Sequence, residues 1–298
     1  MGNRFYIKKT GVLNASGKDF IDFMNRISTA DLRKFPVNEF RKTVLTTDKG
    51  RIIDLIYILN FENQQIILCT YENTEKVKAH LERYIIMDDV IIEKRADEYV
   101  RIISTGENLG EKPEEIFGTK PEKEKVYRIN DDYFFTDDFK FDTFNIICKA
   151  EDADKYKILL SDFEEMNSDE YENMRIGAGL SESENELNEN INPVECGLES
   201  LISFKKGCYI GQEVIARLDS QGKRPKQMVR IISENKIKSG DKIFDEENNE
   251  AGFVSSSVFY ENKYTALGFI RSVNLDFEKK FKTEFAEEES SIIISNIN

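Results

Sequence analysis

The chain has 298 residues, of which 40% are hydrophobic, and a formal net charge of −14 at pH 7. Its length predicts two or three globular domains with a substantial core, and its negative charge disfavours direct binding to the phosphate backbone of a nucleic acid. The single histidine, His80, almost excludes histidine-based catalytic triads and histidine-rich metal sites.

The apolar runs are short and the cysteines are scattered. No run approaches the roughly 18 residues that span a bilayer, and the N-terminal sequence MGNRFYIKKTGVL lacks the apolar stretch of a secretory signal. The four cysteines show no CxxC spacing, so they predict neither a thiol-redox pair nor a zinc knuckle. We therefore expect a cytoplasmic protein with reduced thiols, no metal site and no membrane contact.

The first predicted helix follows a short strand and a turn near the N-terminus. It carries Phe20, Phe23, Met24 and Ile27 on one face, at helical spacing. Such an amphipathic face predicts that the helix packs on a neighbouring sheet.

A β-hairpin and a second helix are predicted next. The turn-forming sequence Asp48-Lys49-Gly50 lies between the apolar runs VLTT and RIIDLIYIL, and its glycine is suited to a positive φ. A further strand then leads to a helix over residues 73–84, in which apolar residues recur at helical spacing.

The middle of the chain repeats this order loosely. Several strands precede a helix predicted over residues 152–166, which suggests two α+β units of similar order. A polar, acidic stretch over residues 181–192 then predicts an exposed connector or lid that ends at Pro193. Beyond Pro225, short strands separated by turns predict a small all-β domain.

We therefore expect an α+β fold with two domains. The first spans residues 1–220 and contains two intertwined α+β subdomains, the second of them at about residues 43–95. The second domain, over residues 221–298, is expected to be a small β-barrel.

The segment SFKKGCYIGQEVIAR, residues 203–217, contains the strongest chemical signal. Gly207 and Gly211 bracket a tight loop, after which the pattern becomes helical. Cys208 would precede a helix N-terminus and has Lys206 nearby, and both features favour a thiolate. Cys208 is thus the candidate reactive residue, and an inert, partly buried thiol is the alternative.

The sequence KGCYIGQEVIAR resembles the KGCYxGQE motif of the YgfZ family, a branch of the glycine-cleavage T-protein (aminomethyltransferase) superfamily. The resemblance continues upstream through Pro193, Glu195 and Leu198, and it includes TTDKGRIIDLIYI with Asp54. It covers nearly the whole chain.

This resemblance implies two ferredoxin-like α+β units and a C-terminal β-barrel around a central opening that holds tetrahydrofolate or a one-carbon derivative. It also implies an accessory role in iron-sulfur cluster assembly or repair, including for radical enzymes that modify tRNA. The expected partners are iron-sulfur assembly proteins or client iron-sulfur enzymes, without direct contact to nucleic acid and without steady turnover.

A folate site needs a carboxylate for the pterin and a cation for the glutamate tail. Asp54 and Glu195 are the candidate acceptors for the pterin nitrogens, and an ordinary solvated carboxylate is the alternative for each. Tyr209 and Gln212 are candidates to wall and hydrogen-bond the ligand, although Tyr209 could equally serve packing. The motif adds Lys206 to this set.

A basic strip follows the motif in the otherwise acidic chain. It consists of Arg217, Lys223, Arg224, Lys226 and Arg230. Such a strip could meet a polyglutamate tail or an acidic partner, or be a solvated face without function.

The chain departs from transferring T-proteins at three positions. Ile53 precedes Asp54 where those proteins carry an acidic pair, Gly177 stands where they have a glutamate, and Thr70 replaces an asparagine. These losses argue against aminomethyl transfer. Three hypotheses follow: the folate-binding accessory protein, a folate-dependent aminomethyl or one-carbon transferase in which Asp54 steadies the amine, and a ligand-free scaffold for a partner protein.

Overall fold

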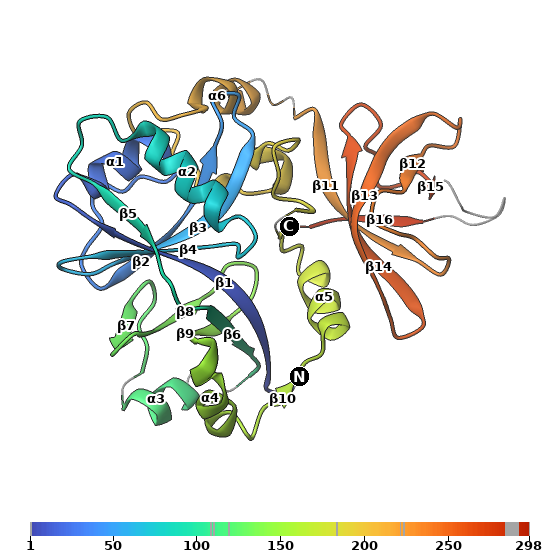
Figure 1. The fold of residues 1–298 in the computed structure, drawn as a ribbon. Coiled ribbons are helices and arrows are strands. Elements are labelled where there is room, and N and C mark those ends of the chain that lie inside the picture. The colour runs from blue at the N-terminus through green and yellow to red at the C-terminus, as the bar shows by residue number, and fades with distance from the viewer. Residues whose placement is uncertain are drawn as a thin grey trace. The chain divides into compact units, whose positions relative to one another are not determined.

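Figure 1 shows the fold of the computed structural model, which describes residues 2–107, 109, 111–118, 120–182, 184–220, 222, 224–283 and 292–297. The chain divides into two compact units. Unit 1 comprises Met1–Thr46, Ile53–Met166 and Leu201–Ile210, and unit 2 comprises Thr47–Ile52, Asn167–Ser200 and Gly211–Asn298. The domain boundary predicted at residue 220 stays a prediction.

Unit 1 is built on a mainly antiparallel sheet with the strand order β2-β3-β4-β1-β6-β9-β8-β7, to which β5 and β10 add by pairing with β1. The strands are β1 (Arg4–Ser16), β2 (Glu39–Thr46), β3 (Ile52–Asn60), β4 (Gln65–Cys69), β5 (Ile91–Lys94), β6 (Tyr99–Thr105), β7 (Val126–Ile129), β8 (Asp132–Asp137), β9 (Thr143–Lys149) and β10 (Glu164–Glu165). The long strand β1 joins two halves of this sheet. Its first part pairs with β6 and its second part pairs with β4 and β5.

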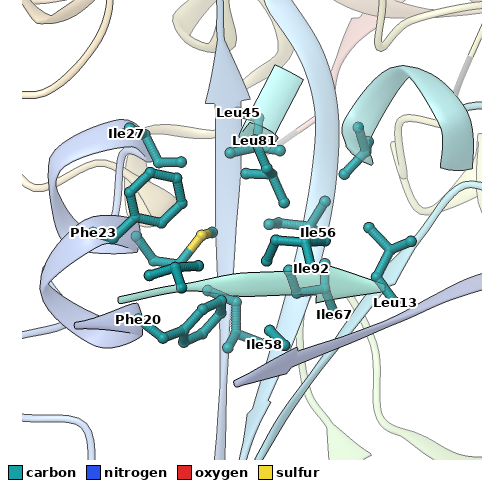
Figure 2. Packing of buried hydrophobic residues seen from close by; sticks show 14 of the residues in the cluster. Leu13, Phe20, Phe23, Ile27, Leu45, Ile56, Ile58, Ile67, Leu81 and Ile92 are labelled. Atoms are coloured by element: carbon teal, nitrogen blue, oxygen red, sulfur yellow. The ribbon is translucent and has the colours of Figure 1, made fainter. Parts of the chain in front are cut away.

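The helices of unit 1 cover the two halves of its sheet. They are α1 (Phe20–Ile27), α2 (Thr74–Tyr84), α3 (Glu111–Phe117) and α4 (Ala153–Leu159), with a 3₁₀ turn η1 (Ala150–Asp152) before α4. Helix α1 buries Phe20, Phe23, Met24 and Ile27, as the sequence predicts. Figure 2 shows these side chains packed with residues of α2 and the strands beneath, among them Leu81. Each such side chain contributes about 1.5–3 kcal/mol when it leaves water.

The predicted hairpin connects β2 and β3. Gly50 adopts a φ of 65° and donates its amide hydrogen bond to the Thr47 carbonyl at 2.9 Å, while the Thr47 amide donates to Arg51 at 2.8 Å. A Cβ on Gly50 would lie 3.2 Å from the side chain of Asn192 and from the Gly211 carbonyl. Backbone conformation and close packing therefore both favour glycine here.

Unit 2 contains an antiparallel sheet with the strand order β15-β12-β13-β14-β11-β16. Its strands are β11 (Lys226–Ser233), β12 (Lys242–Phe244), β13 (Glu250–Tyr260), β14 (Lys263–Arg271), β15 (Lys282–Thr283) and β16 (Ile293–Asn296). The helical elements α5 (Ser168–Gly177), η2 (Pro193–Cys196), η3 (Glu199–Leu201) and α6 (Gln212–Ser220) precede the sheet in the chain. The strand-rich C-terminal region is confirmed, and its closure into a barrel stays a prediction, as do ferredoxin-like units in unit 1.

Two local predictions were wrong. The helix predicted over residues 152–166 ends at Leu159, because the chain turns there to bring Glu164–Glu165 alongside the start of β1. The acidic stretch over residues 181–192 is not exposed throughout, since the Glu186 side chain is fully buried. None of the described helices is long and apolar enough to cross a membrane.

Candidate functional site

Asp54 lies near the start of β3 in unit 1 and is completely buried. Its Oδ2 accepts a hydrogen bond from the Thr70 amide at 2.8 Å, and its Oδ1 accepts bonds from the Thr70 hydroxyl at 2.9 Å and the Leu55 amide at 3.0 Å. Thr70 follows β4 and leads into α2, whose N-cap is Asn73. The carboxylate thus ties β3 to the start of α2.

The buried position changes the acidity of Asp54. Burial raises the pKa of its carboxyl group to about 6, and the hydrogen bonds from Thr70, Leu55 and Asn73 oppose this rise. The neighbouring Cys69 thiol has its pKa raised to about 12, first by burial and then by the charge of Asp54. A buried carboxyl group that titrates near neutral pH is a candidate for proton transfer or for steadying a cationic amine.

Lys206 of the predicted site is buried in unit 1 and serves the fold directly. Its ammonium donates to the carbonyl oxygens of Asn25 at 2.7 Å, Ser28 at 2.5 Å and Ala30 at 2.6 Å, which lie at and beyond the C-terminus of α1. Burial lowers the pKa of Lys206 to about 8, whereas the carbonyl acceptors favour its charged form. Because all three donors are used, Lys206 would bind a ligand only by giving up one of these bonds.

Cys208 is exposed, while Cys69, Cys148 and Cys196 are buried. Burial raises the pKa of the Cys69 and Cys148 thiols to about 12 and raises that of Cys196 as well. Exposure is the condition that the sequence argument set for a reactive thiol. Of the four cysteines, Cys208 is the one that meets this condition.

Tyr209 turns into the protein next to the exposed Cys208. Its ring lies 4.8 Å from the Lys206 ammonium, and burial raises the pKa of its hydroxyl to about 12. Among the described residues, no group accepts or donates a hydrogen bond at this hydroxyl. A buried hydroxyl without a protein partner is a place where a ligand or water can bind.

Glu195 belongs to unit 2 and lies in η2, where it is almost completely buried. Its Oε2 accepts a hydrogen bond from the Asn192 amide at 2.8 Å and lies 3.5 Å from the Arg51 guanidinium. Burial raises the pKa of Glu195, and the Asn192 amide, Lys226 and Arg51 oppose this rise. Glu195 therefore closes a capping box as well as standing among cations.

Gln212 and Arg217 lie on α6 of unit 2. Gln212 begins the helix and is half-buried, whereas Arg217 lies in its last turn and is exposed. The predicted residues thus divide between the units: Asp54, Lys206, Cys208 and Tyr209 belong to unit 1, and Glu195, Gln212 and Arg217 belong to unit 2.

The predicted basic strip is partly spent on other contacts. Arg224 forms an ion pair with Glu199. Lys226 donates to the Asn190 carbonyl at 3.1 Å and lies 5.4 Å from the centre of the Phe253 ring. Lys223, also predicted to belong to the strip, lies outside the described residues.

Sequence reasoning missed a buried polar cluster on the sheet of unit 1. The Tyr57 hydroxyl donates to Asp137 at 3.1 Å, and Lys42 donates to the same carboxylate at 2.5 Å. Arg101 donates to the Tyr57 hydroxyl at 3.2 Å and to Asn145 at 2.9 Å. Burial lowers the pKa of Lys42, with Asp137 opposing. Charged residues inside otherwise apolar strands were the signal that could have revealed this cluster.

A second buried cluster in unit 2 contains Arg175, whose segment was considered only for the absent glutamate at Gly177. Arg175 bonds Glu172 and Glu186, and Glu186 also accepts bonds from Ser255 and Ser256, each at 2.6 Å. Gly177 is exposed, and no heavy atom lies within 4 Å of the position a Cβ would take there. The neighbouring atoms therefore leave room for a larger residue at this position.

The chain is similar in sequence to curated aminomethyltransferases, although no family model matches it. It is 24% identical to the enzyme of Exiguobacterium sibiricum over 267 residues, which are 85% of this chain and 73% of that protein. It is 24% identical to the enzyme of Thermosipho melanesiensis over 284 residues, which are 89% of this chain and 76% of that protein.

Its fold is similar to the crystal structure of the glycine cleavage system aminomethyltransferase T from Bartonella henselae. The TM-score is 0.86 at 16% sequence identity, over 99% of this chain and 85% of that chain. The comparisons support the T-protein superfamily, whereas the narrower YgfZ branch rests on the sequence motif.

Proposed function

We propose that this chain binds tetrahydrofolate or a one-carbon derivative and acts in folate-dependent one-carbon transfer of the aminomethyltransferase kind. The observation that carries the proposal is the similarity to aminomethyltransferases, which spans 85% of this chain for one relative and 89% for another. Similarity of this extent favours the transferase hypothesis over the accessory role that the sequence motif put first.

Asp54 is the residue with the strongest chemical case in this proposal. Its burial and its raised pKa are those expected of a carboxyl group that handles a proton near neutral pH. Above pH 6 its negative charge would steady a cationic amine in a site of low polarity. Tetrahydrofolate, when bound, supplies the amine that takes up the one-carbon group. Glu195 and the unpartnered Tyr209 hydroxyl are further candidates to bind it.

An accessory role in iron-sulfur cluster assembly is the second candidate. The exposed Cys208 in the KGCYIGQE motif favours it, because an accessible thiol suits contact with a cluster or a partner protein. Ile53, Thr70 and Gly177 also stand where transferring T-proteins carry polar groups, and each lost contact weakens transfer by about 1–3 kcal/mol.

A turnover assay separates the two candidates. We would measure one-carbon transfer to tetrahydrofolate from an aminomethyl donor with the wild-type protein, Asp54→Asn and Cys208→Ser. The transferase proposal predicts turnover that falls at least a hundredfold in Asp54→Asn and persists in Cys208→Ser. Folate binding without turnover would favour the accessory role, and the absence of both would favour the scaffold.

A further inference from the structure

Unit 2 contains a cavity of about 450 Å³ that is separate from the residues discussed as folate candidates. Its walls come from η2, the end of α6, the start of β11, the segment after β14, and β16. A volume of this size falls within the range of about 300–1,000 Å³ that is typical of small-molecule sites.

Charged and hydrogen-bonding side chains face this cavity together with aliphatic ones. The polar residues include Asp219, Arg224 and Gln227, and the aliphatic ones include Leu218 and Leu275. Within the described part of the chain, neither the Asp219 carboxylate nor the Gln227 amide has a hydrogen-bond partner among the side chains or backbone. Such polar groups are available to a ligand.

Arg224 is held in place at the cavity wall. One of its terminal nitrogens pairs with Glu199, and its carbonyl accepts a hydrogen bond from the Ser272 hydroxyl. A guanidinium carries five donors, so the pair with Glu199 leaves another edge for a carboxylate. The cavity therefore offers one cationic and one anionic group to a ligand.

The strand β11 separates this cavity from Glu195. Side chains alternate between the two faces of a strand, so Lys226 and Gln227 point to opposite faces. Lys226 lies over the Phe253 and Phe269 rings and acts on the pKa of Glu195, whereas Gln227 lines the cavity.

We infer that this cavity binds a free α-amino acid. Arg224 would take the carboxylate and Asp219 the ammonium group, because these groups match a zwitterion in charge. Leu218 and Leu275 would contact an aliphatic side chain, and Gln227 would donate or accept a further hydrogen bond. The site does not depend on folate binding.

The test is calorimetric titration of L-leucine and L-glutamine into the full chain. Two analogues of leucine separate the contributions: isopentylamine lacks the carboxylate, and 4-methylpentanoate lacks the amine. We expect at least one of the amino acids to bind and both analogues to bind more than tenfold more weakly than leucine. Asp219→Asn and Arg224→Gln should each weaken amino acid binding more than tenfold, and the exposed Glu213→Gln on α6 should leave it unchanged.

Two further measurements keep the inference open to refutation. Gln227→Leu fills the cavity without breaking an ion pair, so it should abolish amino acid binding even if Arg224→Gln unfolds the protein. Tetrahydrofolate binding should be unchanged in Asp219→Asn, which separates this inference from the proposed function. No heat with either amino acid at millimolar concentration, or equal binding of the analogues, would overturn it.

Discussion

Thr70 donates two hydrogen bonds to Asp54, from its amide to Oδ2 at 2.8 Å and from its hydroxyl to Oδ1 at 2.9 Å. Asp54 is fully buried, so these donors replace water around its carboxylate. The same residue that resembles a folate contact in the sequence therefore also fixes the link between β4 and α2. A site residue with both roles is expected to affect stability and ligand binding together.

Asp54→Asn should change how stability depends on pH. The pKa of Asp54 is raised by burial to about 6 in the folded state, from an ordinary value of 3.8. The folded state thus binds the proton more tightly, so the stability from Asp54 is complete below about pH 4 and is lost as pH rises through 6. The loss amounts to about 3 kcal/mol, less the contribution of the Thr70 bonds.

Urea unfolding between pH 4 and pH 8 measures this effect. The difference in unfolding free energy between Asp54→Asn and wild type should rise in favour of the variant as pH increases from 4 to 7. The exposed Glu62→Gln serves as the control and should show no such trend. A difference that is flat with pH would contradict a raised pKa for Asp54.

Thr70→Val tests the hydroxyl contact with little change in side-chain shape. It leaves the Asp54 Oδ1 without one donor in a buried site, and we expect a loss of about 1–3 kcal/mol at pH 8. Thr70→Ser keeps the hydroxyl and should lose less than half of that amount. Equal losses in the two variants, measured by urea unfolding, would show that the hydroxyl bond is unimportant.

Lys206→Met removes the ammonium that binds the carbonyls of Asn25, Ser28 and Ala30. We expect destabilisation of about 2–4 kcal/mol, because three buried acceptors lose their donors. Lys205→Met is the matched control, since Lys205 is adjacent and exposed, and it should cost less than about 0.5 kcal/mol. Similar unfolding free energies for both variants would contradict the anchoring role.

Thiol labelling tests the difference in exposure among the cysteines. In the native protein, a maleimide should modify Cys208 rapidly, and the other three thiols should react only after unfolding. Cys208→Ser should remove the fast phase, while Cys148→Ser should retain it. Fast labelling that persists in Cys208→Ser, detected by mass spectrometry, would contradict this assignment.

The sequence predicted those parts of the fold whose signals are local. The apolar face of α1 and the turn at Gly50 follow from helical spacing and from the conformational freedom of glycine. Helix α5 was missed, although Asn167 and Glu170 form the capping box that begins it and could have been read from their spacing. Its strongly charged sequence concealed the pattern.

The burial of charged residues could not be predicted from the sequence in the same way. Glu186 lies in an acidic stretch that looks solvated, and its burial depends on Arg175, Ser255 and Ser256, which are distant in the chain. Likewise, the motif pointed to Lys206, but only the structure shows that its ammonium binds backbone carbonyls. Tertiary contacts decide such roles, and local spacing does not report them.

Calorimetric titration of tetrahydrofolate and its 5-formyl form tests the central claim most directly. The reduced wild-type protein should bind at least one of these folates, Asp54→Asn should bind it at least tenfold more weakly, and Cys208→Ser should bind it as the wild type does. No heat with either folate for a folded wild-type protein would contradict the account and leave a scaffold that keeps the fold without the ligand.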